Sequence, residues 1–135
     1  MSRTTAERLD AERLIRDPET ALGVIATPDG SPLGIAAYFG LDRAQDRAEL
    51  RVMVGEASLR ADELLEEAVR LWVRYGIEEL GLRKIVASLL GADLLGVRVH
   101  QRLGFDLEGV FRDEVALDDG FHDVVRMALL SPPQV

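Results

Sequence analysis

The fold of this chain is decided by Leu103-Gly104-Phe105-Asp106-Leu107-Glu108-Gly109-Val110-Phe111-Arg112 and, shortly after it, Asp118-Asp119-Gly120-Phe121-His122-Asp123-Val124-Val125-Arg126-Met127. Gly104 follows an amphipathic segment, as a glycine at the C-terminal end of a helix does. The Asp-Gly dipeptide separates two runs that are rich in β-branched and aromatic residues. The stretch therefore predicts the end of a helix followed by an antiparallel pair of strands.

Working outward, hydrophobic periodicity divides the remaining chain into strands and helices. The predicted elements, in chain order, are a weakly amphipathic helix at 5–15, strands at 21–27, 33–39 and 48–54, a helix at about 59–80, a strand at 85–89, a helix at 93–103 and strands at 105–112 and 123–130. Residues 41–47 are predicted to form a connection. The fold class is therefore α/β (α+β), with a mixed, mostly antiparallel central sheet on which a long helix and a shorter C-terminal helix pack.

Composition narrows the class of protein further. A chain of 135 residues with 47% hydrophobic content suits one domain over residues 1–135, with a short N-terminal helix before residue 21 and a core over 21–130. Without cysteine, neither a disulfide nor a thiolate zinc site can form, and two histidines are too few for a persuasive metal site. No signal-peptide core or bilayer-length apolar run is present, so a cytoplasmic protein without a membrane partner is expected. The net charge of −8 repels nucleic acid.

Several motifs resemble those of the GNAT acetyltransferases, closest to the branch that acetylates ribosomal-protein N-termini and small amines. Besides the stretch quoted above, the resemblance rests on Asp29-Gly30-Ser31-Pro32-Leu33-Gly34, Leu41-Asp42-Arg43, Ala48-Glu49-Leu50 and Tyr75-Gly76-Ile77-Glu78-Glu79-Leu80-Gly81-Leu82-Arg83-Lys84-Ile85. It covers about residues 21–130. It implies the GNAT fold and the acetyl-CoA-dependent transfer of an acyl group to an amine, either a small molecule or a protein N-terminus.

The N-terminal segment is shorter than the resemblance implies. Members of the family usually begin with one more strand and one or two helices, which form the near wall of the substrate groove. Here only some twenty residues precede Ala21. The wall is therefore expected to be short, absent or supplied by another subunit. The last alternative predicts a homodimer, which light scattering at micromolar concentration tests.

The resemblance also implies where acetyl-CoA lies: between two splayed central strands, with its pyrophosphate at the N-terminus of the long helix. A helix start presents unpaired N–H groups to an anion. The family pattern Gln/Arg-x-x-Gly-x-Gly/Ala falls on Arg60-Ala61-Asp62-Glu63-Leu64-Leu65, so Arg60 and Ala61 are expected to contact the cofactor, but Glu63 and Leu65 replace the small residues. The backbone of Val52, Met53 and Val54 is expected to contact the thioester and the pantetheine arm.

Asp62 and Glu63 have two interpretations. Acidic residues in a first turn complement the helix dipole by roughly 0.3–1 kcal/mol each, with Ser58 as the N-cap. The same two carboxylates also repel a pyrophosphate. At about 4 Å and an effective dielectric near 20, one unit-charge repulsion costs roughly 4 kcal/mol, of which Arg60 offsets a part.

The second helix departs from the family in its polar residues. The family carries Asn at the start, Ser three residues later and, four residues further, a Tyr that often protonates the departing thiolate. The corresponding residues here are Asp93, Gly96 and His100. Asp93 is expected to cap the helix and to stand among the cofactor contacts. An imidazole donates a proton near neutral pH, so His100 is the candidate general acid, the alternative being a surface or hydrogen-bonded histidine.

The resemblance makes Glu49 the candidate general base, because it lies on the strand where a general base of the family, or its water relay, can sit. A carboxylate on that strand can accept a proton from an ammonium that approaches a thioester. The ordinary alternative is an exposed ion pair, for which Arg51 and Glu56 are close in the sequence. Two classes of function follow: an N-acetyltransferase that uses Glu49 and His100, or a degenerate relative that keeps the fold as a binding or oligomeric scaffold without acetyl-CoA.

Overall fold

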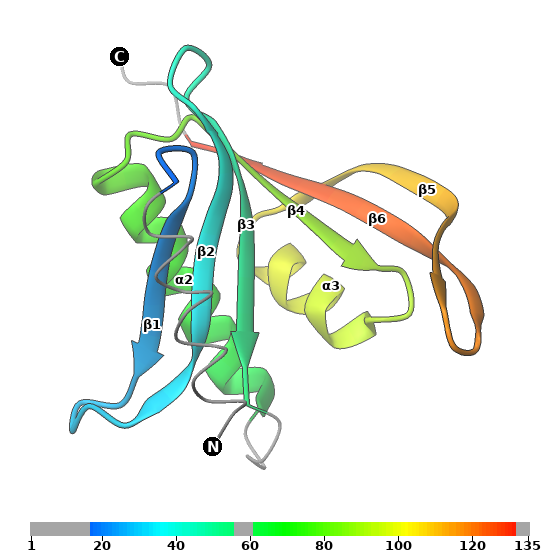
Figure 1. Ribbon diagram of the computed structural model, residues 1–135, viewed down its shortest axis with the longest axis horizontal. Coiled ribbons are helices and arrows are strands. Elements are labelled where there is room, and N and C mark those ends of the chain that lie inside the picture. The colour runs from blue at the N-terminus through cyan, green and yellow to red at the C-terminus, as the bar shows by residue number, and fades with distance from the viewer. Residues whose placement is uncertain (1–16, 56–60, 132–135) are drawn as a thin grey trace.

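The computed structural model describes residues 17–55 and 61–131, which form one six-stranded sheet and two helices (Figure 1). The elements are β1 (Ala21–Ala26), β2 (Pro32–Asp42), β3 (Arg47–Val54), α2 (Ala61–Glu78), β4 (Lys84–Leu90), α3 (Leu94–Arg102), β5 (Asp106–Leu117) and β6 (Gly120–Leu130). The predicted helix at 5–15, and with it Ser58, Arg60 and Glu56, lies outside the described residues.

The strand order across the sheet is β1-β2-β3-β4-β6-β5. Every neighbouring pair is antiparallel except β3 and β4, which are parallel. The predicted mixed, mostly antiparallel sheet is therefore confirmed. The parallel pair lies at its centre, so the two antiparallel halves of the sheet meet between β3 and β4.

The central strands β3 and β4 separate soon after their paired start. Only Arg47↔Lys84, Ala48↔Ile85 and Glu49↔Val86 are register partners, although both strands continue for several residues. Figure 1 shows β3 and β4 diverging from their shared end into a wedge. Beyond Glu49, the edge of β3 that faces β4 has no strand partner among the described residues.

Both helices cover the same face of the sheet. Strand alternation sends Ala48 and Leu50 of β3, and Ile85 and Ala87 of β4, into one core with Val69 of α2 and Val99 of α3. Arg102 of α3 lies 3.5 Å from Glu66 of α2, which links the two helices at the surface. Glu49 and Val86, at the intervening strand positions, therefore point to the opposite face.

Three stacked aromatic rings fasten α2 to the sheet. Trp72 stacks between Tyr38 of β2 and Tyr75, with ring centroids 5.2 and 4.9 Å away. Tyr38 Oη donates a 2.6 Å hydrogen bond to the backbone carbonyl of Trp72. Burial raises the pKa of Tyr38 far above its ordinary value, so the hydroxyl remains a donor. Trp72 is therefore part of the core between the sheet and α2, whereas Tyr75 is 40% exposed at the end of the stack.

The strands differ from the predicted ones mainly in length. β2 continues through Leu41, which is buried, so the connection before β3 is shorter than the predicted one. The final strands extend to a turn at Asp118-Asp119 and form a long hairpin that projects beyond β4 (Figure 1). The β5 side chains are mostly exposed on both sides of the strand and lack the alternation that marks a strand with one buried face. No described helix is long and apolar enough to span a membrane.

Candidate functional site

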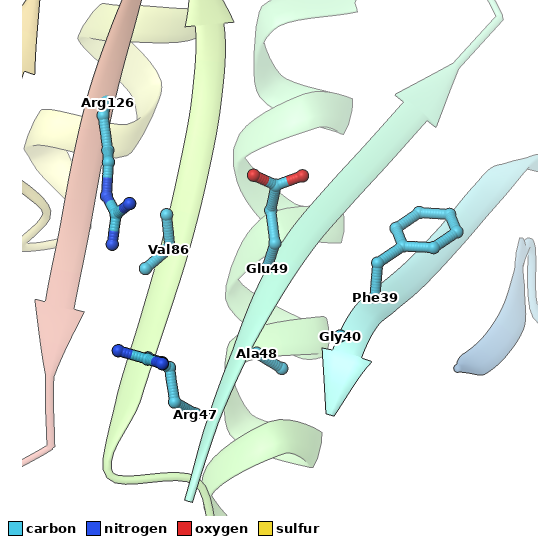
Figure 2. Close-up of a pocket in the computed structure, with 7 residues that line it drawn as sticks. All are labelled: Phe39, Gly40, Arg47, Ala48, Glu49, Val86 and Arg126. Carbon is cyan, nitrogen blue, oxygen red and sulfur yellow. The ribbon is translucent and has the colours of Figure 1, made fainter. Parts of the chain in front are cut away.

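A pocket lies where β3 and β4 begin to separate, on the face that the helices leave uncovered (Figure 2). Its volume is about 280 Å³. The lining residues are Phe39, Gly40, Arg47, Ala48, Glu49, Val86 and Arg126, from four different strands. Gly40 adopts a left-handed conformation, with φ of 61°, at the register shift near the end of β2. The pocket thus joins the end of β2 to the apex of the central wedge.

Glu49 spans this apex. Ser88 Oγ donates a 2.9 Å hydrogen bond to Glu49 Oε1, although the two residues belong to different sides of the wedge. Arg51 lies 3.3 Å from the other carboxylate oxygen of Glu49. The predicted ion pair with Arg51 is therefore present, and the serine fixes one carboxylate oxygen beside the pocket. A carboxylate held in this way is oriented to accept a proton from a ligand in the pocket.

A second group of charges continues across the open face. Glu108 of β5 accepts a 2.9 Å hydrogen bond from Lys84 Nζ, and its other oxygen lies 3.5 Å from Arg126 Nε. The hydrogen bond from Lys84 is the main cause that lowers the pKa of Glu108 below its ordinary value. Glu108 is therefore ionised at neutral pH, and it positions the side chain of Arg126 at the pocket.

The predicted thioester contacts, Val52, Met53 and Val54, lie on β3 beyond the apex. They pair with β2 on one side, while the opposite side of the strand faces the open wedge. Backbone N–H and C=O groups there can donate hydrogen bonds to, and accept them from, a ligand that enters between the strands. The Met53 side chain is 68% exposed. The geometry fits an extended acyl carrier, but contact with one stays a prediction.

The start of α2 presents Asp62 and Glu63 in its first turn, both exposed. Ala61 begins the described helix, and Arg60 lies outside the described residues. The structure therefore keeps two carboxylates at the helix end where the resemblance expects a pyrophosphate. Both side chains face solvent, so water screens their repulsion of a pyrophosphate. The repulsion is therefore weaker than the value derived above from the sequence.

Asp93 is the N-cap of α3, as predicted: its Oδ1 accepts a 2.9 Å hydrogen bond from the backbone N–H of Gly96. Gly96 is needed for this cap, because a Cβ at that position would overlap Asp93 Oδ2 and lie 2.8 Å from Cγ. The glycine that weakens the helix by sequence propensity thus permits its capping contact. A cofactor contact by Asp93 stays a prediction.

His100 is buried in the helix-covered half of the molecule, with 4% exposure. Its Nδ1 donates to the Gly96 carbonyl over 2.7 Å, and its ring packs edge-on against Phe105, 5.0 Å between centroids. Glu49 points to the other face of the sheet. The structure therefore places the two catalytic candidates on different faces and gives His100 the contacts of a hydrogen-bonded core histidine. Its role as a general acid stays a prediction.

His100 predicts a pH dependence of stability. Desolvation lowers its pKa, against the smaller opposing effects of the Gly96 hydrogen bond and Asp93. The unfolded chain therefore binds the proton more tightly, and the stability present above about pH 6.5 is lost as the pH falls toward the lowered pKa. We expect the free energy of unfolding to decrease below that pH with a slope no steeper than about 1.4 kcal/mol per pH unit. Chemical denaturation between pH 5 and 7.5 measures it.

The matched variants are His100→Asn and His122→Gln. Asparagine retains an amide donor for the Gly96 carbonyl but does not titrate, so this variant should be less stable and nearly insensitive to pH in that range. His122 lies near the start of β6, just after the hairpin turn, with Nε2 2.6 Å from Asp119 Oδ1. Replacing His122 should leave the slope of the free energy of unfolding against pH unchanged. A slope that persists in His100→Asn would assign the titration to another group.

The sequence analysis did not identify three polar residues at or beside the pocket: Ser88, Arg126 and Arg47. A signal exists for the first two, because each is a polar residue within an apolar run, Ser88 between Ala87 and Leu89 in β4 and Arg126 between Val125 and Met127 in β6. The alternation of a strand then places them on one face, but it does not show which strands are neighbours.

Among residues 17–55 and 61–131, no three His, Asp or Glu side chains are grouped as a metal ion requires.

Comparison with known proteins shows which protein family this chain is similar to. The family described as "Acetyltransferase (GNAT) domain" matches residues 2–106. The probable N-acetyltransferase YjcK of Bacillus subtilis is 29% identical over 121 residues, which are 90% of this chain and 67% of that protein. The putative ribosomal N-acetyltransferase YdaF of the same organism is 28% identical, over 76% of this chain and 55% of that protein. The chain thus spans about half to two thirds of these relatives.

Solved structures show the same fold. The spermidine/spermine N-acetyltransferase SpeG of Vibrio cholerae superimposes with a TM-score of 0.82 at 18% identity, over 92% of this chain and 74% of that one. A structure described as a probable acetyltransferase reaches a TM-score of 0.78 at 25% identity, over 90% and 68% of the two chains. The described sheet and helices therefore share the fold of the matched part of these proteins.

Proposed function

The chain belongs to the GNAT acetyltransferase family, and on that premise we propose that it transfers the acetyl group of acetyl-CoA to an amine in the pocket beside Glu49. The observation that carries the proposal is the hydrogen bond from Ser88 to Glu49 across the apex of the wedge. It holds a carboxylate where the strand edge of β3, the open wedge and a pocket meet.

In this proposal Glu49 prepares the acceptor. A protonated amine has no lone pair, so the nitrogen must lose a proton before it attacks a carbonyl carbon. The Glu49 carboxylate receives that proton directly or through a water molecule, while Ser88 and Arg51 keep it oriented. Phe39 and Val86 supply the apolar lining that holds the rest of the acceptor.

The residues for acetyl-CoA are those along the wedge. GNAT acetyltransferases use acetyl-CoA, which supplies a thioester-activated acetyl group when bound. The free edge of β3 at Val52, Met53 and Val54 offers backbone groups to an extended chain between the strands. Arg60, Ala61 and Asp93 are proposed contacts nearer the two helix starts.

A second candidate function is that of a scaffold that no longer binds acetyl-CoA. Asp62 and Glu63, both exposed in the first turn of α2, favour it, because they oppose a pyrophosphate at that helix end. Calorimetric titration with acetyl-CoA at moderate salt distinguishes the two. Micromolar binding together with acetylation of an amine panel supports the transferase, and no binding at millimolar concentration supports the scaffold.

The charge at the helix start makes a separate prediction. Replacing Asp62 by Asn and Glu63 by Gln should tighten acetyl-CoA binding by about 30-fold at low salt, since each of the two exposed charges opposes the phosphates by about 1 kcal/mol. Raising the ionic strength should reduce the difference between the variant and the original protein. Calorimetry measures both.

Glu67→Gln is the control for this pair, because Glu67 is exposed on the same helix beyond its first turn. It removes one negative charge at a distance from the helix end and should change the affinity little. An equal gain from the control would mean that net charge, and not the helix start, governs the binding.

A further inference from the structure

The pocket beside Glu49 contains two guanidinium groups. Figure 2 shows the side chains of Arg126 and Arg47 extending toward the same region beside Val86, with the Glu49 carboxylate on the other side of that valine. The lining therefore carries two positive charges against one negative charge, in a protein whose net charge is −8. Two cations that converge without an anion between them repel each other.

The described partners of these arginines leave part of that charge uncompensated. Arg126 Nε lies 3.5 Å from Glu108 Oε1, and the same carboxylate binds Lys84 at the shorter distance of 2.9 Å. Arg47 lies 3.9 Å from Asp42, a long contact between side chains that are 48% and 38% exposed. Neither pair is a close, two-point arginine–carboxylate contact.

From this geometry we propose that the acceptor amine carries a carboxylate, which Arg126 and Arg47 bind while its amino group lies toward Glu49. The inference rests on the proposed function, and it adds the class of substrate: a free amino acid or a closely similar small amino carboxylate. Guanidinium is suited to this task because its planar donors match the two oxygens of a carboxylate.

The dimensions of the sheet agree with a small zwitterion. Arg126 stands on β6 and Glu49 on β3, with β4 between them. Neighbouring strands are about 4.8 Å apart, so the two backbones are separated by about 10 Å, and side chains from both approach over Val86. The pocket of about 280 Å³ holds a molecule the size of an amino acid together with water.

The same charges disfavour a polyamine. A linear polycation needs carboxylates spaced along its length, whereas here a second positive charge of the acceptor would meet Arg126 or Arg47. Spermidine is therefore expected to be a poor acceptor for this chain, although several proteins of similar fold are described as spermidine acetyltransferases.

The test compares each amino acid of a panel with its carboxamide, in steady-state acetylation with acetyl-CoA. The amide has nearly the same shape but no negative charge, and its amino group loses a proton more easily, so intrinsic reactivity favours the amide. We expect kcat/KM to be at least about 10-fold higher for the preferred free acid. Higher values for the amides or for spermidine would overturn the inference and leave the proposed transferase intact.

Arg126→Gln shows whether the arginine is responsible. It should lower kcat/KM for the acid by roughly 10- to 100-fold, mainly through KM, and change that for the amide less than about 3-fold. Activity with the amide also shows that the variant is folded. Arg70→Gln, on the helix-covered side of the molecule, is the matched control and should change neither value. An equal loss for acid and amide would overturn the assignment.

If no amine is acetylated, the proposed function fails and binding decides the inference alone. Calorimetric titration of the chain with the amino acid panel should then give binding that Arg126→Gln and Arg47→Gln each weaken. Absence of binding by every member of the panel would overturn the inference as well.

Discussion

Replacing Glu49 by glutamine is expected to lower kcat for acetyl transfer by about 10²- to 10⁴-fold, the usual contribution of a positioned general base. Glutamine has nearly the same shape, and its carbonyl oxygen can still accept the hydrogen bond from Ser88. What it loses is the capacity to take a proton at neutral pH. Steady-state kinetics with the preferred amine, at saturating acetyl-CoA, measures the loss.

Whether Glu49→Gln changes kcat or KM distinguishes a general base from a group that only binds the amine. A loss confined to KM would make Glu49 an amine-binding group and contradict its assignment as a base. Ser88→Ala should have a smaller effect, about 3- to 10-fold in kcat, because it removes only the orienting hydrogen bond. Glu67→Gln on α2 is the matched control and should leave kcat unchanged.

Gly76→Ala is expected to destabilise the protein by about 2–4 kcal/mol. A Cβ at residue 76 would overlap Tyr38 Oη and lie 2.6 Å from its Cζ. Tyr38 is fully buried, and its hydroxyl is bonded to the Trp72 carbonyl, so the ring cannot move without loss of this bond and of the aromatic stack. The gain in helix propensity from glycine to alanine, about 1 kcal/mol, offsets only part of the cost.

Thermal and denaturant unfolding measure this change, and a decrease in Tm of roughly 10 °C corresponds to it in a chain of this size. Gly109→Ala is the control, since a Cβ there meets no atom within 4 Å and the residue has no positive φ. Tyr38→Phe combined with Gly76→Ala removes the nearest contact and should restore part of the stability. A Gly76→Ala variant as stable as the original would show that β2 and α2 adjust freely.

Local signals in the sequence predict most of the fold. The period of α2, the capping residue Asp93 and the stop at Gly104 each depend on neighbours within a few residues, and the structure contains all three. The long hairpin shows the limit of such signals. Its outer half has no buried face, so no alternation marks residues 113–117 as a strand.

The candidate site was also predicted only in part. Glu49 was predicted from a family resemblance, and the structure places it at the pocket. His100 was also predicted from the resemblance, at the position of the family's Tyr, and the structure buries it on the opposite face, where its hydrogen bond to Gly96 and its contact with Phe105 account for it. A helical position gives the spacing of a side chain but not the face of the sheet that it reaches.

By itself the sequence determined the order and type of the elements, the membership of the chain in its family and the acidic start of α2, because these depend on residue identity and short-range periodicity. Only the tertiary structure decided the site. Ser88 meets Glu49 across 39 positions of sequence, and Arg126 reaches the same pocket from β6. Such contacts arise from the strand order and from the point at which β3 and β4 separate, and both are set by packing and pairing between segments far apart in the chain.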